Sequence, residues 1–263
     1  MPVDSDVVEK DRIVLGNGES IYESLTVRAR LTFLAHLFKA CFKQHHKSLT
    51  AGFATFLQPD SVVLDIGAHS GQYTKLIARI VPEGHVWAAE PSSYAYTILQ
   101  RAIRLNGIPN VTTVRTAFSD YAGETVLHMP IKKSGSMGFG LSHFGDQWRD
   151  GRYSSESVPV TTVDRFVAER NISRVDLIKA DIEGWEVRVL AGAKDTIQKF
   201  KPAIYLELVD NFLLKAGDSI TCAWERLEAA GYSGFRMGDD GTLAPAESRS
   251  EGDLLFLARS RAR

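Results

Sequence analysis

Residues 62–74 read VVLDIGAHSGQYT, and this stretch decides the fold class of the chain. The apolar run 62–66, interrupted only by Asp65, is typical of a parallel strand that is buried on both faces. The small residues that follow, including Gly67 and Gly71, let the chain turn sharply into a helix. Ligands of open parallel sheets bind at the carboxyl ends of the strands. The stretch therefore predicts a small-molecule pocket in an α/β sheet.

The spacing of the glycines argues against a dinucleotide as the ligand. A G-x-G-x-x-G turn needs its middle glycine so that a pyrophosphate can approach the backbone. His69 occupies that position here, and the Asp65 carboxylate would repel a pyrophosphate but attract an ammonium or sulfonium group. We therefore expect S-adenosylmethionine. Its own carboxylate would bind the amide groups that open the helix after Gly71.

A second acid supports this ligand. Residues 84–91, GHVWAAEP, predict the next strand, which ends at Glu90, and an acid in that position commonly holds a ribose diol. The alternative is that Asp65 and Glu90 are a helix cap and a surface charge. The combination of the two acids favours the cofactor site.

From residue 61 onward, strands and helices alternate, which predicts a doubly wound parallel sheet. Helices are expected to start near Gly71, Ser92, Gly184 and Asp218. The last two strands flank a loop rich in Gly, Asp and Pro, and we expect them to form a closing hairpin in a seven-stranded sheet. The expected strands are 62–66, 86–90, 111–115, 175–180, 203–208, 232–237 and 253–258.

Two regions lie outside this alternation. Residues 1–57 are expected to form a hairpin over 12–22 and then one or two helices, packed on a core domain of residues 58–263. An insertion over about 121–160 holds an expected strand, 125–129, and a long loop from 130 to 157. Long loops beside a cofactor cleft are often lids or acceptor sites. The alternative is a mobile surface insertion.

The fourth main strand ends in a cluster of ionisable residues. If extended geometry persists past Ala180, then Lys179, Asp181 and Glu183 lie on one side of the chain. Burying three such groups is costly, which favours a functional site. A salt bridge from Lys179 to Asp181 or Glu183 that fixes the turn is the structural alternative.

Composition agrees with a globular α/β protein of one main domain. The 263 residues are 44% hydrophobic and 24% charged, with a net charge of −1. Nucleic-acid binding is not expected, because it needs concentrated Lys and Arg. The two cysteines, Cys41 and Cys222, lack metal-ligand spacing, and a reducing cytoplasm is the expected location. We expect neither a signal peptide nor a membrane span, since the apolar segment 33–42 is too short.

Four segments, VVLDIGAHSGQYT, VWAAEPSSYAYTILQRAIRLN, VPVTTVDRF and VDLIKADIEGWEVRVLAGA, together resemble the FkbM-type family of S-adenosylmethionine-dependent methyltransferases. The resemblance extends from about residue 61 to 208. It implies a class I methyltransferase fold, which is Rossmann-like, and methyl transfer to a hydroxyl of a carbohydrate or a secondary metabolite. His69 departs from the asparagine that is common at that position. The cofactor contacts that the resemblance implies are Asp65, Gly67, His69, Gly71 and Glu90.

We extend this cofactor set to Tyr73 and Asp181, and to residues after the third strand. Ser119 and Asp120 fall where related folds hold the adenine, and Phe118 either covers that ring or belongs to the core. S-adenosylhomocysteine is the expected product, and the expected partner is a small-molecule or glycan acceptor. The N-terminal helices are expected to cover either the sheet or a second subunit, so a homodimer remains open.

Methyl transfer requires an aligned acceptor oxygen and a group that removes its proton. The candidates for this base are Asp181, Glu183, Glu207 and His143. A divalent metal is left open, since Asp181, Glu207 and Asp210 could supply oxygen ligands to Mg²⁺. Two other functions stay open as well, a nucleotide-dependent oxidoreductase and a non-catalytic cofactor-binding protein.

Overall fold

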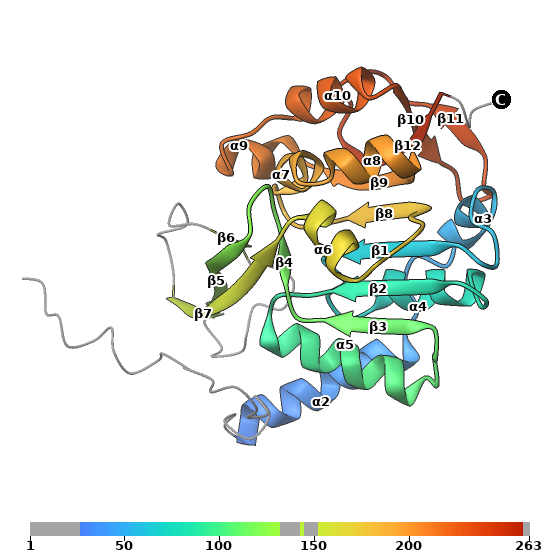
Figure 1. Ribbon diagram of the computed structural model, residues 1–263. Coiled ribbons are helices and arrows are strands. Elements are labelled where there is room, and N and C mark those ends of the chain that lie inside the picture. Colours follow the sequence, from blue (N-terminus) through green and yellow to red (C-terminus); the bar gives the residue numbers. More distant parts are fainter. Residues whose placement is uncertain (1–26, 132–142, 145–151, 260–263) are drawn as a thin grey trace, which may run out of the picture.

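The computed structural model describes residues 27–131, 143–144 and 152–259 and is dominated by an eight-stranded sheet (Figure 1). The strand order is β11-β10-β12-β9-β8-β1-β2-β3. All seven expected strands are confirmed, and β11 is an additional short strand at the edge. The strands are β1 (Val62–Ile66), β2 (His85–Ala89), β3 (Val111–Val114), β8 (Leu177–Ala180), β9 (Ala203–Leu208), β10 (Tyr232–Met237), β11 (Leu243–Pro245) and β12 (Gly252–Ala258).

The order of the strands defines where a ligand can bind. Strands β3, β2, β1, β8 and β9 are parallel neighbours, whereas β12 pairs antiparallel with both β9 and β10. The chain proceeds outward from β1 through β2 to β3 and then returns to the other side of β1 as β8. This reversal between β1 and β8 is a topological switch point, where parallel sheets open a crevice at their carboxyl ends.

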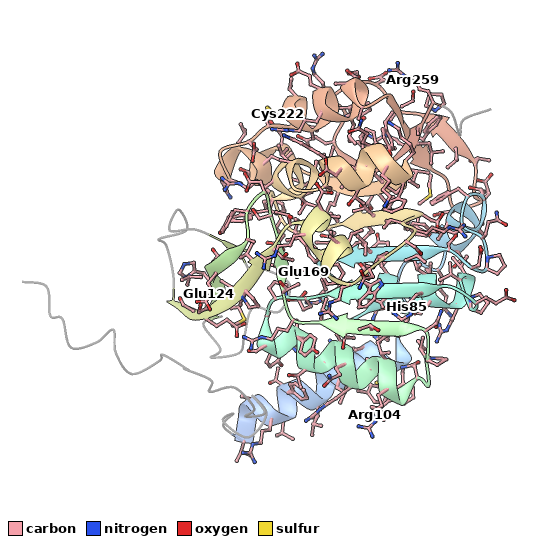
Figure 2. All side chains as sticks on the ribbon, viewed as in Figure 1. His85, Arg104, Glu124, Glu169, Cys222 and Arg259 are labelled. Carbon is pink, nitrogen blue, oxygen red and sulfur yellow. The ribbon has the colours of Figure 1, made fainter. Side chains whose placement is uncertain are left out.

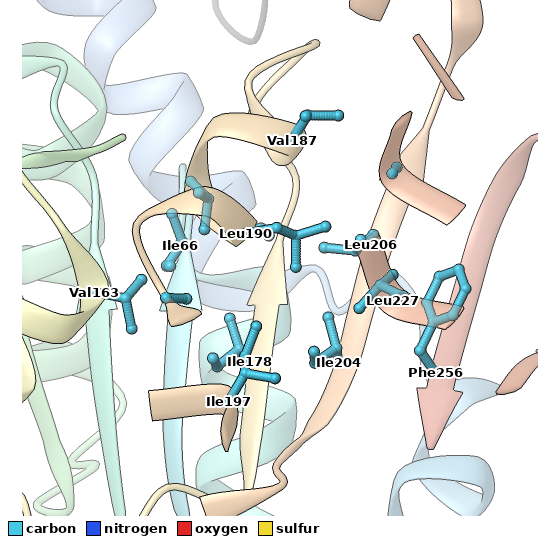
Figure 3. Packing of buried hydrophobic residues seen from close by; sticks show 14 of the residues in the cluster. Ile66, Val163, Ile178, Val187, Leu190, Ile197, Ile204, Leu206, Leu227 and Phe256 are labelled. Atoms are coloured by element: carbon cyan, nitrogen blue, oxygen red, sulfur yellow. The ribbon is translucent and has the colours of Figure 1, made fainter. Parts of the chain in front are cut away.

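Helices cover both faces of the sheet, as expected for a doubly wound fold. On one face, Leu64, Ile178 and Ile204 pack against α6, α7, α8 and α10 (Figure 3). On the other face, Val63 and Tyr205 pack against α3 and α4. The helices are α2 (Val27–Phe42), α3 (Leu49–Ala54), α4 (Gln72–Ile80), α5 (Ser93–Leu105), α6 (Val163–Glu169), α7 (Glu186–Ala191), α8 (Lys194–Phe200), α9 (Asp210–Lys215) and α10 (Ile220–Ala229).

The alternation of side chains along the strands sorts the polar groups by face. Because Leu64 and Ile178 face one helix layer, Asp65 and Lys179 face the other, on the side of α3 and α4. Since Tyr205 shares that face, Glu207, two residues later on β9, lies there too. One face of the sheet thus carries the ionisable side chains of three neighbouring strands.

The insertion forms a second sheet, with the order β4-β7-β5-β6. Its strands are β4 (Ala117–Phe118), β5 (Gly123–Ile131), β6 (His143–Phe144) and β7 (Arg152–Thr161). The prediction of a loop over 130–157 was therefore wrong for residues 130–131, 143–144 and 152–157, which pair as strands because β5 and β7 form a long antiparallel ladder. The rest of that loop lies outside the described residues. Figure 1 shows this sheet beside the carboxyl ends of β1, β2 and β3.

Within residues 27–57, which the structure describes, the N-terminal part contains two helices, α2 and α3, where one or two were expected. The expected hairpin over 12–22 lies outside the described residues. Helix α2 packs on α5, and α3 packs on the sheet through Phe53. The division into a segment 1–57 and a core domain stays a prediction. None of the helices in the described ranges combines the length and the apolar character needed to cross a membrane.

Candidate active site at the carboxyl ends of β1, β8 and β9

The glycine turn after β1 is held tightly against its neighbours. Gly67 and Gly71 have φ angles of 73° and 80°, in the left-handed region that favours glycine. The amides of Gly67 and Ala68 donate to the carbonyl of Ala89 at 3.0 and 2.9 Å. A Cβ atom on Gly67 would overlap the backbone oxygen of Asp181. Glycine is required here because the turn and the end of β8 are in direct contact.

Lys179 is the centre of the buried charges. Its ammonium lies 3.3 Å from the Asp65 carboxylate and 3.6 Å from that of Asp181, and it donates to the carbonyl of Gly67 at 3.1 Å. Burial lowers the pKa of Lys179, but Asp65 and Asp181 outweigh that effect and raise it overall. The Thr74 hydroxyl also donates to Asp65, at 2.5 Å. The Asp65 carboxylate thus contacts Lys179 and Thr74. Its negative charge affects the site by holding these two side chains in position.

Asp181 and Glu207 form the next layer of the site, at the ends of β8 and β9. The Asp181 side chain is 37% exposed, which makes it the accessible acid beside Lys179. Burial, then Asp181 and its hydrogen bond to Glu207, raise the pKa of Glu207 to about 8. Asp253 of β12 is the register partner of Glu207 and adds to this effect. At neutral pH the Glu207 side chain therefore holds a proton beside the Asp181 carboxylate.

The turn after β8 corrects the expectation that extended geometry continues to Glu183. Strand β8 ends at Ala180, and Glu183 has a φ angle of 53°, so its side chain leaves the row formed by Lys179 and Asp181. The structure has the Lys179–Asp181 salt bridge; the ion pairs of Lys179 do not include Glu183. Burial and then Asp181 raise the pKa of Glu183 to about 8.

Glu186 braces this turn and was not among the predicted site residues. Its buried carboxylate accepts hydrogen bonds at 3.0 Å from the amides of Ile182 and Gly184. Burial raises the pKa of Glu186 to about 7. A carboxylate at the first position of a short helix also suits the helix dipole. In the sequence, nothing distinguishes Glu186 from a surface acid, because its role depends on the preceding turn.

Glu90 directly follows β2 and closes the glycine turn from the other side. Its two carboxylate oxygens accept from the amides of His69 and Ser92, each at 2.9 Å. The side chain is buried, and burial raises the pKa of Glu90 to about 7. Each oxygen keeps a further lone pair. A ribose diol can therefore add to these bonds without displacing them.

His69 and Tyr73 flank the turn. Burial lowers the pKa of His69 to about 4, so its imidazole is neutral near pH 7. Tyr73, in the first turn of α4, lies with its ring 4.9 Å from the Lys179 ammonium. His46, which precedes α3 and was not predicted as a site residue, stacks on Tyr73 with ring centroids 4.4 Å apart. The N-terminal segment thus contributes an aromatic side chain to this end of the sheet.

The expected adenine region consists of β4 of the second sheet and the two residues that follow it. Ser119 is buried and donates from its hydroxyl to the exposed Asp120 at 3.0 Å. Phe118 belongs to the core and packs edge-on against Phe166. Strand β7 is joined to the start of α5 and the end of β3 through Glu156, which accepts from the amide of Ser93 at 2.8 Å and pairs with Arg115 at 3.0 Å.

Two predicted residues lie apart from this cluster. His143 is on β6 of the second sheet, opposite His128 in the register. Asp210 accepts from the amide of Ile220 at 3.3 Å, at the beginning of α10. Over the described ranges, no three or more His, Cys, Asp or Glu side chains gather in an arrangement that could hold a metal ion. Asp210 is thus engaged in a helix contact, apart from Asp181 and Glu207.

Comparison with known proteins agrees with this geometry. The family model for the methyltransferase FkbM domain matches residues 65–233. A 2-O-methyltransferase, NoeI, of Sinorhizobium fredii is 28% identical over 167 residues, which cover 59% of this chain and 66% of that protein. A 31-O-demethyl-FK506 methyltransferase, FkbM, of Streptomyces tacrolimicus is 27% identical over 218 residues, which cover 73% of this chain and 78% of that protein.

A solved structure, methyltransferase FkbM from Methylobacillus flagellatus, aligns with a TM-score of 0.48 and 14% identity. That alignment covers 86% of this chain and 59% of the solved chain. The strand order and the switch point are those of a Rossmann-like fold, and the family match identifies a methyltransferase of the class that uses S-adenosylmethionine. The chain belongs to the FkbM family of these enzymes, because the family model matches more than half of it.

Proposed function

We propose that the chain transfers the methyl group of S-adenosylmethionine to a hydroxyl of a carbohydrate or a secondary metabolite. The observation that carries this proposal is the contact of Lys179 with both Asp65 and Asp181, directly beside the glycine turn. Through this contact, the glycine turn expected to bind the cofactor lies next to Asp181, the acid expected to face the acceptor. Both are at the switch point between β1 and β8.

The residues of the turn suit the cofactor. S-adenosylmethionine supplies a methyl group that its sulfonium already activates. In our proposal Glu90 holds the ribose diol, because both of its oxygens retain acceptor capacity after binding His69 and Ser92. Gly67 and Gly71 allow the tight turn between β1 and α4. In our proposal His69 and Tyr73 line the methionine end. Ser119 and Asp120 are assigned to the adenine. Asp65 positions Lys179 and the first turn of α4 through Thr74.

Asp181 is the residue that we assign to the acceptor hydroxyl. It is partly exposed, it pairs with Lys179, and it shares a hydrogen bond with Glu207. The hydroxyl proton would pass to the Asp181–Glu207 pair as the oxygen attacks the methyl carbon. A base in hydrogen-bond reach contributes on the order of 10²–10⁴-fold to the rate. His143 and Glu183 remain secondary candidates for the base.

Oxygen as the acceptor atom is supported by the relatives. The names of the Sinorhizobium fredii and Streptomyces tacrolimicus proteins both specify methyl transfer to oxygen. We therefore propose that the methyl acceptor of this chain is a small molecule or a glycan that carries hydroxyl groups.

A transfer assay with S-adenosylmethionine labelled in its methyl group tests the proposal. The wild-type chain is screened against sugars, glycolipid precursors and macrolide-like alcohols, and we expect label in at least one of these hydroxyl compounds. The variant Asp181→Asn should lose about 10²-fold or more in turnover, whereas Asp210→Asn, outside the cluster, should retain activity. Exclusive labelling of a nitrogen or carbon acceptor, or full activity of Asp181→Asn, would contradict the assignment.

A further inference from the structure

Helix α2 carries apolar side chains that are exposed in the part of the chain that the structure describes. They recur every three or four residues, so they lie on one side of the helix. Two of them, Phe38 and Phe42, have ring centroids 4.7 Å apart and form a continuous surface. We call this set the α2 stripe; its members and exposed fractions are Val27 (77%), Leu31 (65%), Leu34 (46%), Phe38 (61%) and Phe42 (75%).

The α2 stripe is exceptional on this molecule. The other exposed large hydrophobic residues in the described ranges lie on separate elements and have no such neighbours; they are Leu105, Tyr121, Val126 and Leu214. Single exposed apolar residues are normal on protein surfaces, whereas a contiguous apolar surface marks an interaction site.

The orientation of the stripe is fixed by the fold. The opposite face of α2 packs on α5 through Phe33, which is 0% exposed and meets the ring of Tyr94 edge-on. The ammonium of Lys75, on α4, donates to the backbone carbonyls of Ala40 and Lys43 at the end of α2. Because α2 is held by both α4 and α5, the stripe lies on the exposed side of the helix. Figure 1 shows α2 at the lower border of the molecule.

The charged residues of α2 and of the segment that follows it are all cations. The chain as a whole is nearly neutral, but the sequence from Val27 to Lys47 has no Asp or Glu. Lys39, Lys43 and Lys47 are exposed. Helix α5 also lacks acids, and its exposed Arg104 lies at the same border of the molecule (Figure 2). The cations of this segment are Arg28, Arg30, Lys39, Lys43 and Lys47.

An apolar stripe flanked by cations on an exposed helix has the chemistry of an interfacial membrane helix. Anionic headgroups complement the lysines, while Leu31, Phe38 and Phe42 enter the acyl boundary. A second copy of the chain fits less well, because a two-fold contact through the stripe would bring the cationic flanks of both copies together. We propose that α2 docks this enzyme, by its α2 stripe, on the surface of an anionic lipid bilayer.

Sedimentation of the full chain with lipid vesicles tests this proposal. Vesicles of phosphatidylcholine alone are compared with vesicles of equal parts phosphatidylcholine and phosphatidylglycerol. We expect binding to the anionic vesicles that is at least about tenfold stronger than to the neutral ones and weakens at high salt. The double variant Phe38→Ala/Phe42→Ala should lose about tenfold or more in affinity, because two rings leave the acyl boundary.

The matched control is Leu214→Ala, which removes a side chain of similar exposure (60%) on α9 and should bind vesicles as the wild type does. Far-ultraviolet circular dichroism and methyl transfer to a dissolved acceptor should be unchanged in the double variant, because its two side chains are exposed. Absence of wild-type binding to anionic vesicles would overturn the proposal, and so would equal binding of the double variant. A wild-type dimer in light scattering that the double variant dissociates would also overturn it, since a second copy would then cover the stripe.

Discussion

The Lys179 ammonium lies 3.3 Å from the Asp65 carboxylate, and the two side chains are 2% and 0% exposed. The sheet itself creates this pair, because Asp65 and Lys179 are register partners on the adjacent strands β1 and β8. Two charges buried together are tolerated, but one of them left alone is costly. Loss of the ion pair should therefore both destabilise the fold and disturb the glycine turn, because Lys179 also donates to the carbonyl of Gly67.

Replacing Lys179 by Met should destabilise the protein by about 3–5 kcal/mol, because it leaves the Asp65 carboxylate buried without its cation. Arg165→Met is the control, since the Arg165–Glu169 pair on α6 is exposed on both sides. That exposed pair is expected to contribute about 1 kcal/mol or less. Urea unfolding of both variants measures the difference, and equal losses would contradict the role of Lys179.

Replacing Gly67 by Ala should weaken binding of S-adenosylhomocysteine by at least roughly tenfold, about 1.4 kcal/mol. The added Cβ atom overlaps the backbone oxygen of Asp181 and forces the turn away from β8. Gly231→Ala is a matched control, because Gly231 has a φ angle of 86° but no atom within 4 Å of the added carbon. If calorimetry gives the same affinity for both variants, the contact between Gly67 and Asp181 is irrelevant to cofactor binding.

The rate of methyl transfer should rise with pH and level off above about pH 8. Burial and Asp181 raise the pKa of Glu207 to about 8, so the Asp181–Glu207 pair loses its shared proton only above that pH. Glu207→Gln should remove this rise, whereas Asp210→Asn should keep it. A pH–rate profile of Glu207→Gln that coincides with the wild-type profile would refute the involvement of Glu207.

The melting temperature without ligand should fall as the pH rises from about 4.5 to about 8. In the folded protein the pKa of Glu183 is raised to about 8, so the fold retains a proton that the unfolded chain releases near pH 4.5. Protonated Glu183 contributes its full stabilisation below about pH 4.5. This contribution declines as the pH rises and is lost above about pH 8. Glu183→Gln should show a smaller fall than the wild type in calorimetric scans, and an equal fall would count against the buried state of Glu183.

The parallel strands were predictable because each is a short apolar run followed by a helix signal, as in residues 62–74. The shape of the β1 turn was predictable because Gly67 and Gly71 favour a sharp connection from strand to helix. The second sheet was not predictable over 130–157, because it depends on pairing between distant segments, and the loop residues carry no alternating pattern of their own.

The site was predictable where its residues follow a strand directly, as Glu90 and Asp181 do. The Lys179–Asp65 pair required the register of β1 against β8, which pairs residues 114 positions apart and which neither strand encodes alone. Glu186 and His46 were missed for a related reason. Their contacts, with the amides of the β8 turn and with Tyr73, exist only once the turn and the N-terminal segment have folded.

Isothermal calorimetry with S-adenosylhomocysteine and with NAD, on the wild-type chain, is the most direct test of the central claim. The acid-lined turn with His69 in place of a middle glycine should accept the former and reject the latter. We expect one S-adenosylhomocysteine per chain, bound with micromolar affinity, and no heat of binding from NAD. Binding of NAD together with no binding of S-adenosylhomocysteine would contradict the account.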